Sequence, residues 1–213
     1  MLEFASVPDR KFPVEIRRRK GMRHMRLSIN LQNSIVVSAP WHRSKAECLD
    51  FIDNNRRWLE QQIARVPPVI HIREWLRLYP ELSAGGQWLA VSIGKSTTSR
   101  ARYCIDRAGA RIELQLPPGL DPDAAVSGLV RKFAGEVLPA RVGEFSARHG
   151  LRLSRISVRD QSSRWGSCSS RRAISLNWRL VLLRSELQDY VILHELAHLT
   201  EMNHSKRFWA LLD

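Results

Sequence analysis

The chain has 213 residues, of which 44% are hydrophobic, and it carries 34 Lys and Arg against 21 Asp and Glu, a net charge of +13. This composition excludes wholesale disorder, and no apolar run reaches the ~18 residues that a membrane span needs. Its three cysteines form no C-x-x-C pair and no secretory signal opens the chain, so we expect a cytoplasmic protein without a disulfide scaffold.

The positive charge is concentrated in two stretches of the sequence. Residues 10–26 and residues 151–184 each hold eight basic residues against one acidic residue, a net charge of +7 in each stretch. Basic segments of this kind are typical of surfaces that bind nucleic acid or another polyanion. Nucleic acid is therefore a candidate partner through these two segments, and no membrane partner is expected.

The N-terminal part is predicted to be rich in strands. Short aliphatic runs separated by turn residues predict an antiparallel meander, closed by Pro40. Ser44 is placed to cap a helix over about 44–64, and Pro67-Pro68 ends this part. Three more strands follow before Pro117-Pro118-Gly119, the clearest break in the chain. The expected strands cover 14–18, 25–29, 34–38, 87–93, 101–105 and 111–116.

The break at 117–119 predicts a boundary between a β-rich α+β subdomain, 1–120, and a second domain, 121–213. The second domain opens with a long helix from Asp121 or Asp123 to about residue 149. Strands are expected over 156–158 and 173–178, and a capping box at Ser185 opens a helix to about residue 202. Ser205 can cap a last short helix. Strands and helices mix without βαβ alternation, which indicates an α+β fold.

Five residues in the last predicted long helix form the motif His194-Glu195-Leu196-Ala197-His198. Residues i and i+4 share one face of a helix, so His194 and His198 can bind one zinc ion together. Bound zinc lowers the pKa of a water ligand toward ~7. Glu195, about 100° around the helix, is placed to take the remaining proton and pass it to a leaving amine. The motif therefore predicts a catalytic zinc site.

A catalytic zinc needs a third protein ligand, and the sequence offers two. His204 follows the expected helix end, where Asn203 can turn the chain back toward the metal. Glu201 shares the helical face of the first two histidines and could ligate the ion or hydrogen-bond a ligand histidine. We favour His204, because it can approach the metal from another direction. Ordinary hydrogen-bonded histidines remain the alternative, although burying them in this apolar stretch without a partner would be costly.

Several segments together resemble the YgjP-like zinc metallopeptidases, relatives of the SprT-like group of H-E-x-x-H zincins. They are Ser163-Arg164-Trp165-Gly166-Ser167-Cys168, Ile174-Ser175-Leu176-Asn177, the His194–His198 motif, Met202-Asn203-His204-Ser205 and Phe208-Trp209. The resemblance is close over 155–213, looser over 14–66 and only general over 67–120. Relatives generally continue beyond residue 213, so the second domain is expected to be truncated at its C-terminus.

The resemblance implies a zincin-like metallopeptidase domain with an active-site helix and a small antiparallel sheet. It implies His194, His198 and His204 as the ligands of one zinc ion and Glu195 as the general base. Peptidases of this type bind an extended peptide along an exposed strand beside the metal helix. The strand 173–178 is the candidate, with an ordinary core strand as the alternative.

Three residues are candidates for holding the substrate. Ser175 and Asn177 lie on the candidate strand, and Arg164 lies in the Gly/Ser-rich turn before residue 168. Arg164 or Asn177 could stabilise an oxyanion. The alternative is that the turn has only a structural role.

The expected function is that of a zinc-dependent metallopeptidase that hydrolyses peptide bonds of a peptide or protein substrate. The alternatives are a nucleic-acid-associated protein with structural or vestigial zinc, and a protease that acts on DNA-bound proteins.

Overall fold

A computed structural model describes residues 4–7, 10–30, 33–65 and 69–212. The chain divides into two compact units, unit 1 up to Ile70 and unit 2 from His71 onward. The boundary predicted after residue 120 therefore falls inside unit 2. The reason is that Leu82, Leu89 and Ile112, which precede residue 120, share one hydrophobic core with the long helix that follows it. The predicted break at Pro67-Pro68 lies outside the described residues.

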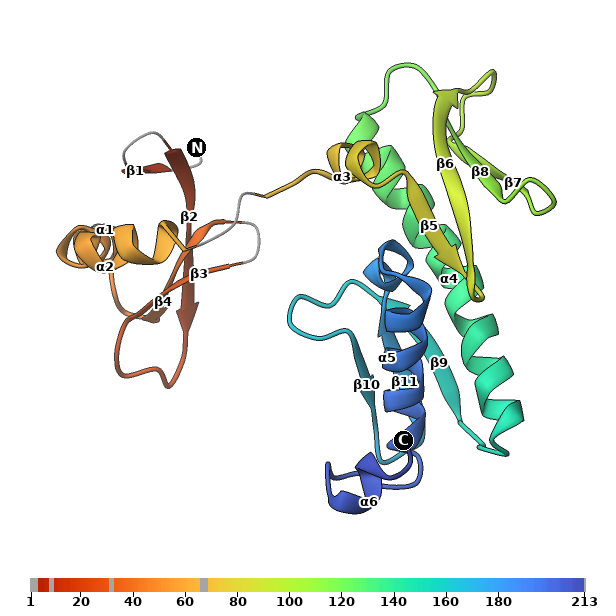
Figure 1. Ribbon diagram of the computed structural model, residues 1–213. Helices are drawn as coiled ribbons and strands as arrows, with labels where there is room; N and C mark the ends of the chain where they lie inside the picture. Colours follow the sequence, from red (N-terminus) through yellow and green to blue (C-terminus); the bar gives the residue numbers. More distant parts are fainter. Residues whose placement is uncertain (1–3, 8–9, 31–32, 66–68, 213) are drawn as a thin grey trace. The chain divides into compact units, whose positions relative to one another are not determined.

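Unit 1 is a four-stranded sheet with two helices packed against it (Figure 1). The sheet order is β1-β2-β4-β3, and β2 pairs with β4 in parallel, so the predicted antiparallel meander is wrong. β4 takes the centre because Ile35, Val36 and Val37 are all buried, on both of its faces, whereas β3 alternates as an edge strand does. The strands are β1 (Phe4–Val7), β2 (Arg10–Arg19), β3 (Arg26–Ile29) and β4 (Ile35–Pro40).

The helix predicted over 44–64 is present but broken. α1 (Lys45–Asn54) starts at a capping box in which the Ser44 hydroxyl accepts from the Glu47 N–H. The predicted cap at Ser44 is therefore confirmed. Asn55 leaves the helical conformation, and its side-chain amide donates to the Phe51 carbonyl, which separates α1 from α2 (Arg56–Ile63). Asn favours such local side-chain bonds over a continuous helix.

The first part of unit 2 contains a second sheet with the same topology as the sheet of unit 1. The strand order is β5-β6-β8-β7, with β6 and β8 parallel and β7 antiparallel to β8. The predicted strands 87–93, 101–105 and 111–116 are confirmed, whereas a short helix and strand before them were not predicted. The elements are α3 (Ile72–Leu78), β5 (Glu81–Ala84), β6 (Gln87–Lys95), β7 (Arg102–Asp106) and β8 (Arg111–Leu116).

The long helix α4 (Pro122–Arg148) confirms the prediction from Asp121, whose carboxylate accepts from the Asp123 N–H at the N-cap. It continues through Pro139 and contacts both the second sheet and the third (Figure 1). The guanidinium of Arg141 on α4 donates to both carboxylate oxygens of Asp189 at 2.9 and 2.6 Å. This pair joins α4 to the helix that carries the predicted metal site.

The third sheet has the order β10-β11-β9 and is mixed, because β9 and β11 are parallel. The expectation of a purely antiparallel sheet beside the active helix is therefore corrected. The strands 156–158 and 173–178 are confirmed as β9 and β11, whereas β10 was predicted as a turn. The elements are β9 (Arg155–Arg159), β10 (Gly166–Cys168), β11 (Ala173–Asn177), the 3₁₀-helix η1 (Trp178–Leu182), α5 (Ser185–Ala197) and α6 (Lys206–Trp209).

α5 differs at both ends from the predicted helix. Arg184 holds the N-cap position without a side-chain cap, so the capping box predicted at Ser185 is wrong. Gln188 is buried, and its side-chain amide donates to the Leu180 carbonyl instead. The helix ends at Ala197, five residues early, which leaves His198 as its C-cap residue. Ser205 caps α6 as predicted, accepting from the Phe208 N–H. No helix within the described ranges is long and apolar enough to cross a membrane.

Candidate metal centre

Three histidines from α5 and the turn after it meet at one point. His194 lies in the last turn of α5, His198 at its C-cap and His204 just before α6. One ring nitrogen from each lies within 4.8 Å of the others, and the Nε2 atoms of His194 and His204 are 3.0 Å apart. Glu201 is not part of this group. The structure thus brings together the histidine triad that the sequence predicted.

The donor set fits a zinc ion. The Nδ1 atom of His198 lies 3.1 Å from the Glu201 carbonyl, which fixes the tautomer and leaves Nε2 as the free nitrogen. Burial, and then the neighbouring histidines, lower the pKa of His194, which favours the neutral form of its ring. Neutral imidazoles with converging lone pairs are what zinc binds, and three of them leave one position open. No carboxylate is among these ligand atoms.

Phe208 on α6 packs against the rings of all three histidines. Its ring is fully buried, and its centroid lies 4.9, 4.6 and 4.6 Å from those of His194, His198 and His204. No role in the site was predicted for Phe208 from the sequence. The sequence feature that could have pointed to Phe208 is the helix cap at Ser205. This cap starts α6 directly after the third histidine and so places Phe208 near it.

Glu195 is 6% exposed and lies against the third sheet. Burial raises the pKa of its carboxyl group to about 7, and the positive charge of Arg164 opposes that rise. A Cβ placed on Gly166 of β10 would lie 2.5 Å from the Glu195 Oε1 atom. Glu195 is therefore a buried carboxyl group of α5 that lies against β10, and it feels the positive charge of Arg164.

The other predicted substrate residues lie on β11. Ser175 is partly buried, and its hydroxyl accepts from the Gln161 side chain at 3.4 Å. Asn177 is 5% exposed. Its amide donates to the Gln161 and Arg164 carbonyls, and its carbonyl oxygen accepts from the Arg179 N–H. Asn177 therefore holds the loop that presents Arg164, and its side chain has no group left for a substrate.

The strand that lies at the sheet edge beside α5 is β10. β11 has β10 on one side and β9 on the other, so the structure favours a central core strand for 173–178. The Trp165 carbonyl accepts from the Asn177 N–H, and the Ser169 N–H donates to the Ala173 carbonyl. Because antiparallel strands bond at every second pair, the peptide groups of Gly166 and Cys168 face outward.

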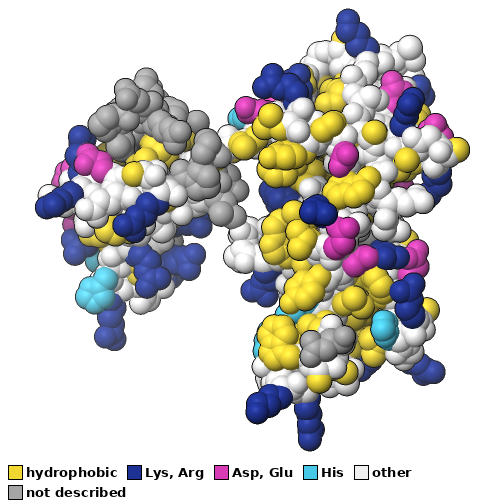
Figure 2. All heavy atoms as spheres, in the orientation of Figure 1, with side chains coloured by type: hydrophobic (Ala, Val, Ile, Leu, Met, Phe, Trp, Pro, Cys, Tyr) yellow, Lys and Arg dark blue, Asp and Glu magenta, His cyan; other side chains and the backbone are white. Residues whose placement is uncertain are grey.

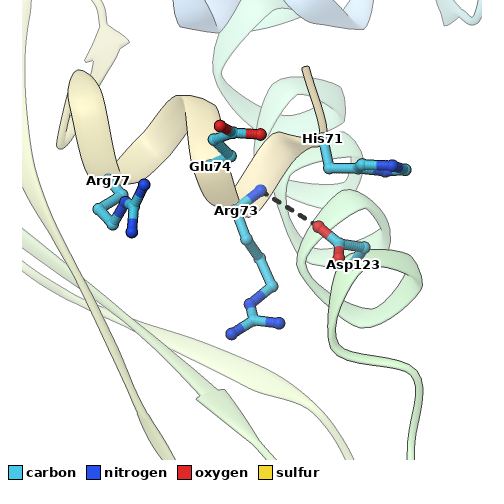
Figure 3. A pocket seen from close by; sticks show the side chains of 5 residues that line it. All are labelled: His71, Arg73, Glu74, Arg77 and Asp123. Atoms are coloured by element: carbon cyan, nitrogen blue, oxygen red, sulfur yellow. Dashed lines mark hydrogen bonds between the residues drawn. The ribbon is translucent and has the colours of Figure 1, made fainter. Parts of the chain in front are cut away.

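One pocket, with a volume of about 360 Å³, lies elsewhere in unit 2, between α3 and the start of α4 (Figure 3). Its lining residues are His71, Arg73, Glu74, Arg77 and Asp123. The backbone N–H of Arg73 donates to Asp123, and the two arginine side chains do not converge. None of these residues belongs to the predicted site.

A helix bearing His-Glu-x-x-His, followed by a third histidine that meets the first two, is the arrangement of a metallopeptidase domain. The family model described as YgjP-like, metallopeptidase domain, matches residues 23–213. The chain therefore belongs to the YgjP-like metallopeptidase family, and the match includes residues 67–120, where the sequence resemblance was only general. No curated protein and no solved structure matches the chain.

Proposed function

We propose that this chain is a zinc-dependent metallopeptidase with His194, His198 and His204 as the metal ligands and Glu195 as the general base. The observation that carries the proposal is the convergence of three histidine ring nitrogens within 4.8 Å in a member of a metallopeptidase family. A bound zinc ion supplies a Lewis acid that polarises the scissile carbonyl and makes water acidic.

Glu195 performs the proton transfers of this reaction. Its carboxylate accepts a proton from the attacking water and donates it to the nitrogen of the leaving amine when the peptide bond breaks. Burial raises the pKa of this carboxyl group to about 7 in the metal-free site, and the positive charge of a bound zinc ion would lower it and favour the carboxylate that acts as the base. The exposed guanidinium of Arg164, close enough to act on Glu195, is available to a negative charge that develops on the substrate.

The substrate binds in extended form along the outer edge of β10. The outward peptide groups of Gly166 and Cys168 offer it hydrogen bonds that read backbone and not sequence. Gly166 is the residue of β10 in contact with Glu195, so a peptide on this edge lies beside the general base. Peptides carrying a single N-methyl group test this arrangement. Loss of cleavage should alternate with the methyl position, and equal cleavage of all of them would contradict strand pairing.

The substitution Glu195→Gln tests the mechanism. The zinc-loaded variant should retain about one zinc ion per chain and lose peptide hydrolysis by ~100-fold or more, as expected when a general base is removed. Glu186→Gln is the control, because Glu186 lies on the same helix but is exposed and far along the sequence from the histidines. Unchanged hydrolysis in Glu195→Gln would sink the mechanism, and no zinc in wild type would sink the site.

A further inference from the structure

The sheet of unit 1 and the second sheet share one topology, which permits a comparison of corresponding ends. Arg19 is the last residue of β2 and pairs with Pro40 of β4, just as Lys95 ends β6 and pairs with Leu116 of β8. From this match, residues 17–26 correspond to residues 93–102. The first stretch holds six Lys and Arg and the second holds three. Arg18, Lys20 and Arg23 correspond to Gly94, Ser96 and Ser99, so this sheet topology does not require a basic residue at those three positions.

The strand register gathers these residues at one end of the sheet. The parallel pairing places Arg18 and Arg19 beside Ala39 and Pro40, and the connection to β3 returns at the same end. Figure 2 shows Lys and Arg side chains over the part of unit 1 toward which β2 points in Figure 1. We call this group the basic end of unit 1: Arg18, Arg19, Lys20, Arg23, Arg26 and Arg43, with Trp41.

Acidic side chains neutralise little of this charge. Arg43 pairs with Glu47, and within the described ranges no ion pair involves Arg18, Arg19, Lys20, Arg23 or Arg26. Burial raises the pKa of the Cys48 thiol, and the charges of Arg18 and Arg43 oppose that rise. Two arginines from separate segments thus lie within electrostatic range of one buried atom, the Cys48 sulfur.

Trp41 lies at the same end of the sheet as these basic residues, and its side chain is exposed. It is 64% exposed, the largest fraction among the exposed large hydrophobic residues of the described chain. It follows the last residue of β4, and the Arg43 N–H donates to the Pro40 carbonyl at 3.1 Å, which closes a turn under it. Its only ring neighbour among the described residues is His42, edge-on at 6.0 Å. Most of the surface of the Trp41 side chain is therefore open to solvent and available to a flat ligand.

We propose that the basic end of unit 1 binds single-stranded nucleic acid, with its arginines and lysine on the phosphates and a base stacked on Trp41. Cationic side chains around an exposed aromatic ring are the combination that binds unpaired strands. A duplex would leave Trp41 without a partner, because its bases are already stacked. An acidic protein would pair with the basic side chains but would offer no base to stack on the Trp41 ring. An anionic membrane would need more apolar surface than one tryptophan supplies.

Fluorescence anisotropy of labelled 20-nucleotide oligo-dT with the full chain tests this proposal over a range of salt concentrations. Trp41→Ala should weaken binding ~10-fold, and Trp41→Phe should restore most of it. The triple variant Arg19→Gln/Lys20→Gln/Arg23→Gln should make the slope of log affinity on log salt shallower by about 2. The control Lys95→Gln/Arg100→Gln/Arg107→Gln removes the same charge from exposed positions in unit 2 and should leave the slope unchanged.

Several outcomes would overturn the proposal. They are equal effects of the two triple variants, no effect of Trp41→Ala, tighter binding of duplex than of oligo-dT, equal competition by polyglutamate, and preference for phosphatidylserine vesicles. All substituted side chains are exposed, and circular dichroism checks that the variants fold. A chelator should leave oligo-dT binding intact, so this result is separable from the proposed peptidase activity.

Discussion

Gly166 of β10 and Glu195 of α5 lie so close that no side chain fits between them. A Cβ added to Gly166 would approach the Oε1, Cγ and Cδ atoms of Glu195 to 2.5, 2.6 and 2.8 Å. Gly166 does not adopt a positive φ, so glycine is required here by the close approach and not by backbone conformation. The glycine therefore sets how near the carboxyl group of Glu195, the proposed general base, lies to the open edge of the sheet.

Substituting Gly166→Ala should displace Glu195 and lower kcat ~100-fold, because small misplacements of a catalytic group are costly. Zinc content should stay the same, because the three atoms nearest to the added methyl group all belong to Glu195 and not to a histidine. Gly143→Ala in α4 is the control, since nothing lies within 4 Å of the added methyl group and alanine favours a helix. Peptidase kinetics and zinc analysis on both variants decide this, and full activity of Gly166→Ala would contradict the expected role of the contact.

Glu201 should matter for its backbone and not for its carboxylate. The carbonyl of Glu201 is the group near His198 Nδ1, and His204 is the residue that joins the other histidines. We expect Glu201→Gln to bind zinc as wild type does, whereas His204→Ala should fall from about one zinc ion per chain to none after dialysis. Zinc measured by atomic absorption checks this pair, and the reverse result would make Glu201 the third ligand.

We expect Arg172 to act as a positioning residue for the proposed metal ligands. Its guanidinium donates to the Arg152 carbonyl at 2.6 Å and to the Leu199 carbonyl at 3.2 Å, next to His198. Its φ is +59°, so Arg172→Gly keeps the backbone and removes only the side chain. Zinc affinity should fall ~10-fold in Arg172→Gly and recover partly in Arg172→Lys.

The neighbouring exposed residue supplies the control for this prediction. Arg171→Ala removes the same charge, and no hydrogen bond or ion pair of its side chain occurs among the described residues. Competition with a chromophoric chelator measures zinc affinity in each variant. If Arg171→Ala and Arg172→Gly weakened zinc equally, the effect would be one of net charge and not of position.

The capping box of α1 should make the stability of unit 1 depend on acidity. Hydrogen bonds from Ser44 and then from Arg43 lower the pKa of Glu47 from its ordinary 4.5 to about 2. A lowered pKa in the folded state means that the carboxylate stabilises the fold above pH 4.5 and loses this effect as the pH falls toward 2. The difference in stability between wild type and Glu47→Gln should therefore shrink over that range.

Urea unfolding followed by circular dichroism between pH 2 and pH 6 measures this dependence. Ser44→Ala, which removes the other half of the box, should lower stability by about 1 kcal/mol at pH 6. Asp50→Asn is the control, since Asp50 lies on the same helix outside the capping box. A gap between wild type and Glu47→Gln that stays constant down to pH 2 would contradict the prediction.

The histidine cluster could be predicted from sequence because the spacing of its first two members is local. His194 and His198 are one helical turn apart, so the motif fixes their geometry wherever the helix packs. The edge position of β10 could not be predicted in this way, because strand order depends on contacts distant in sequence. Val36 illustrates the same limit in unit 1, since a short apolar run does not say whether a strand is central or at an edge. The early end of α5 could not be predicted either. The partner of His198 is the Glu201 carbonyl in the turn after the helix, and helix propensity does not specify the conformation of that turn.

The packing of Phe208 against all three histidine rings joins metal occupancy to the order of the last helix. Because α6 presses on the ligands, an ion that fixes the rings also favours the docked helix, and by reciprocity a docked helix favours the ion. Metal removal should therefore loosen the segment from Leu199 onward while the distant sheets keep their protection. Hydrogen exchange measured with and without zinc would show this coupling as slower exchange of the C-terminal backbone amides when zinc is bound.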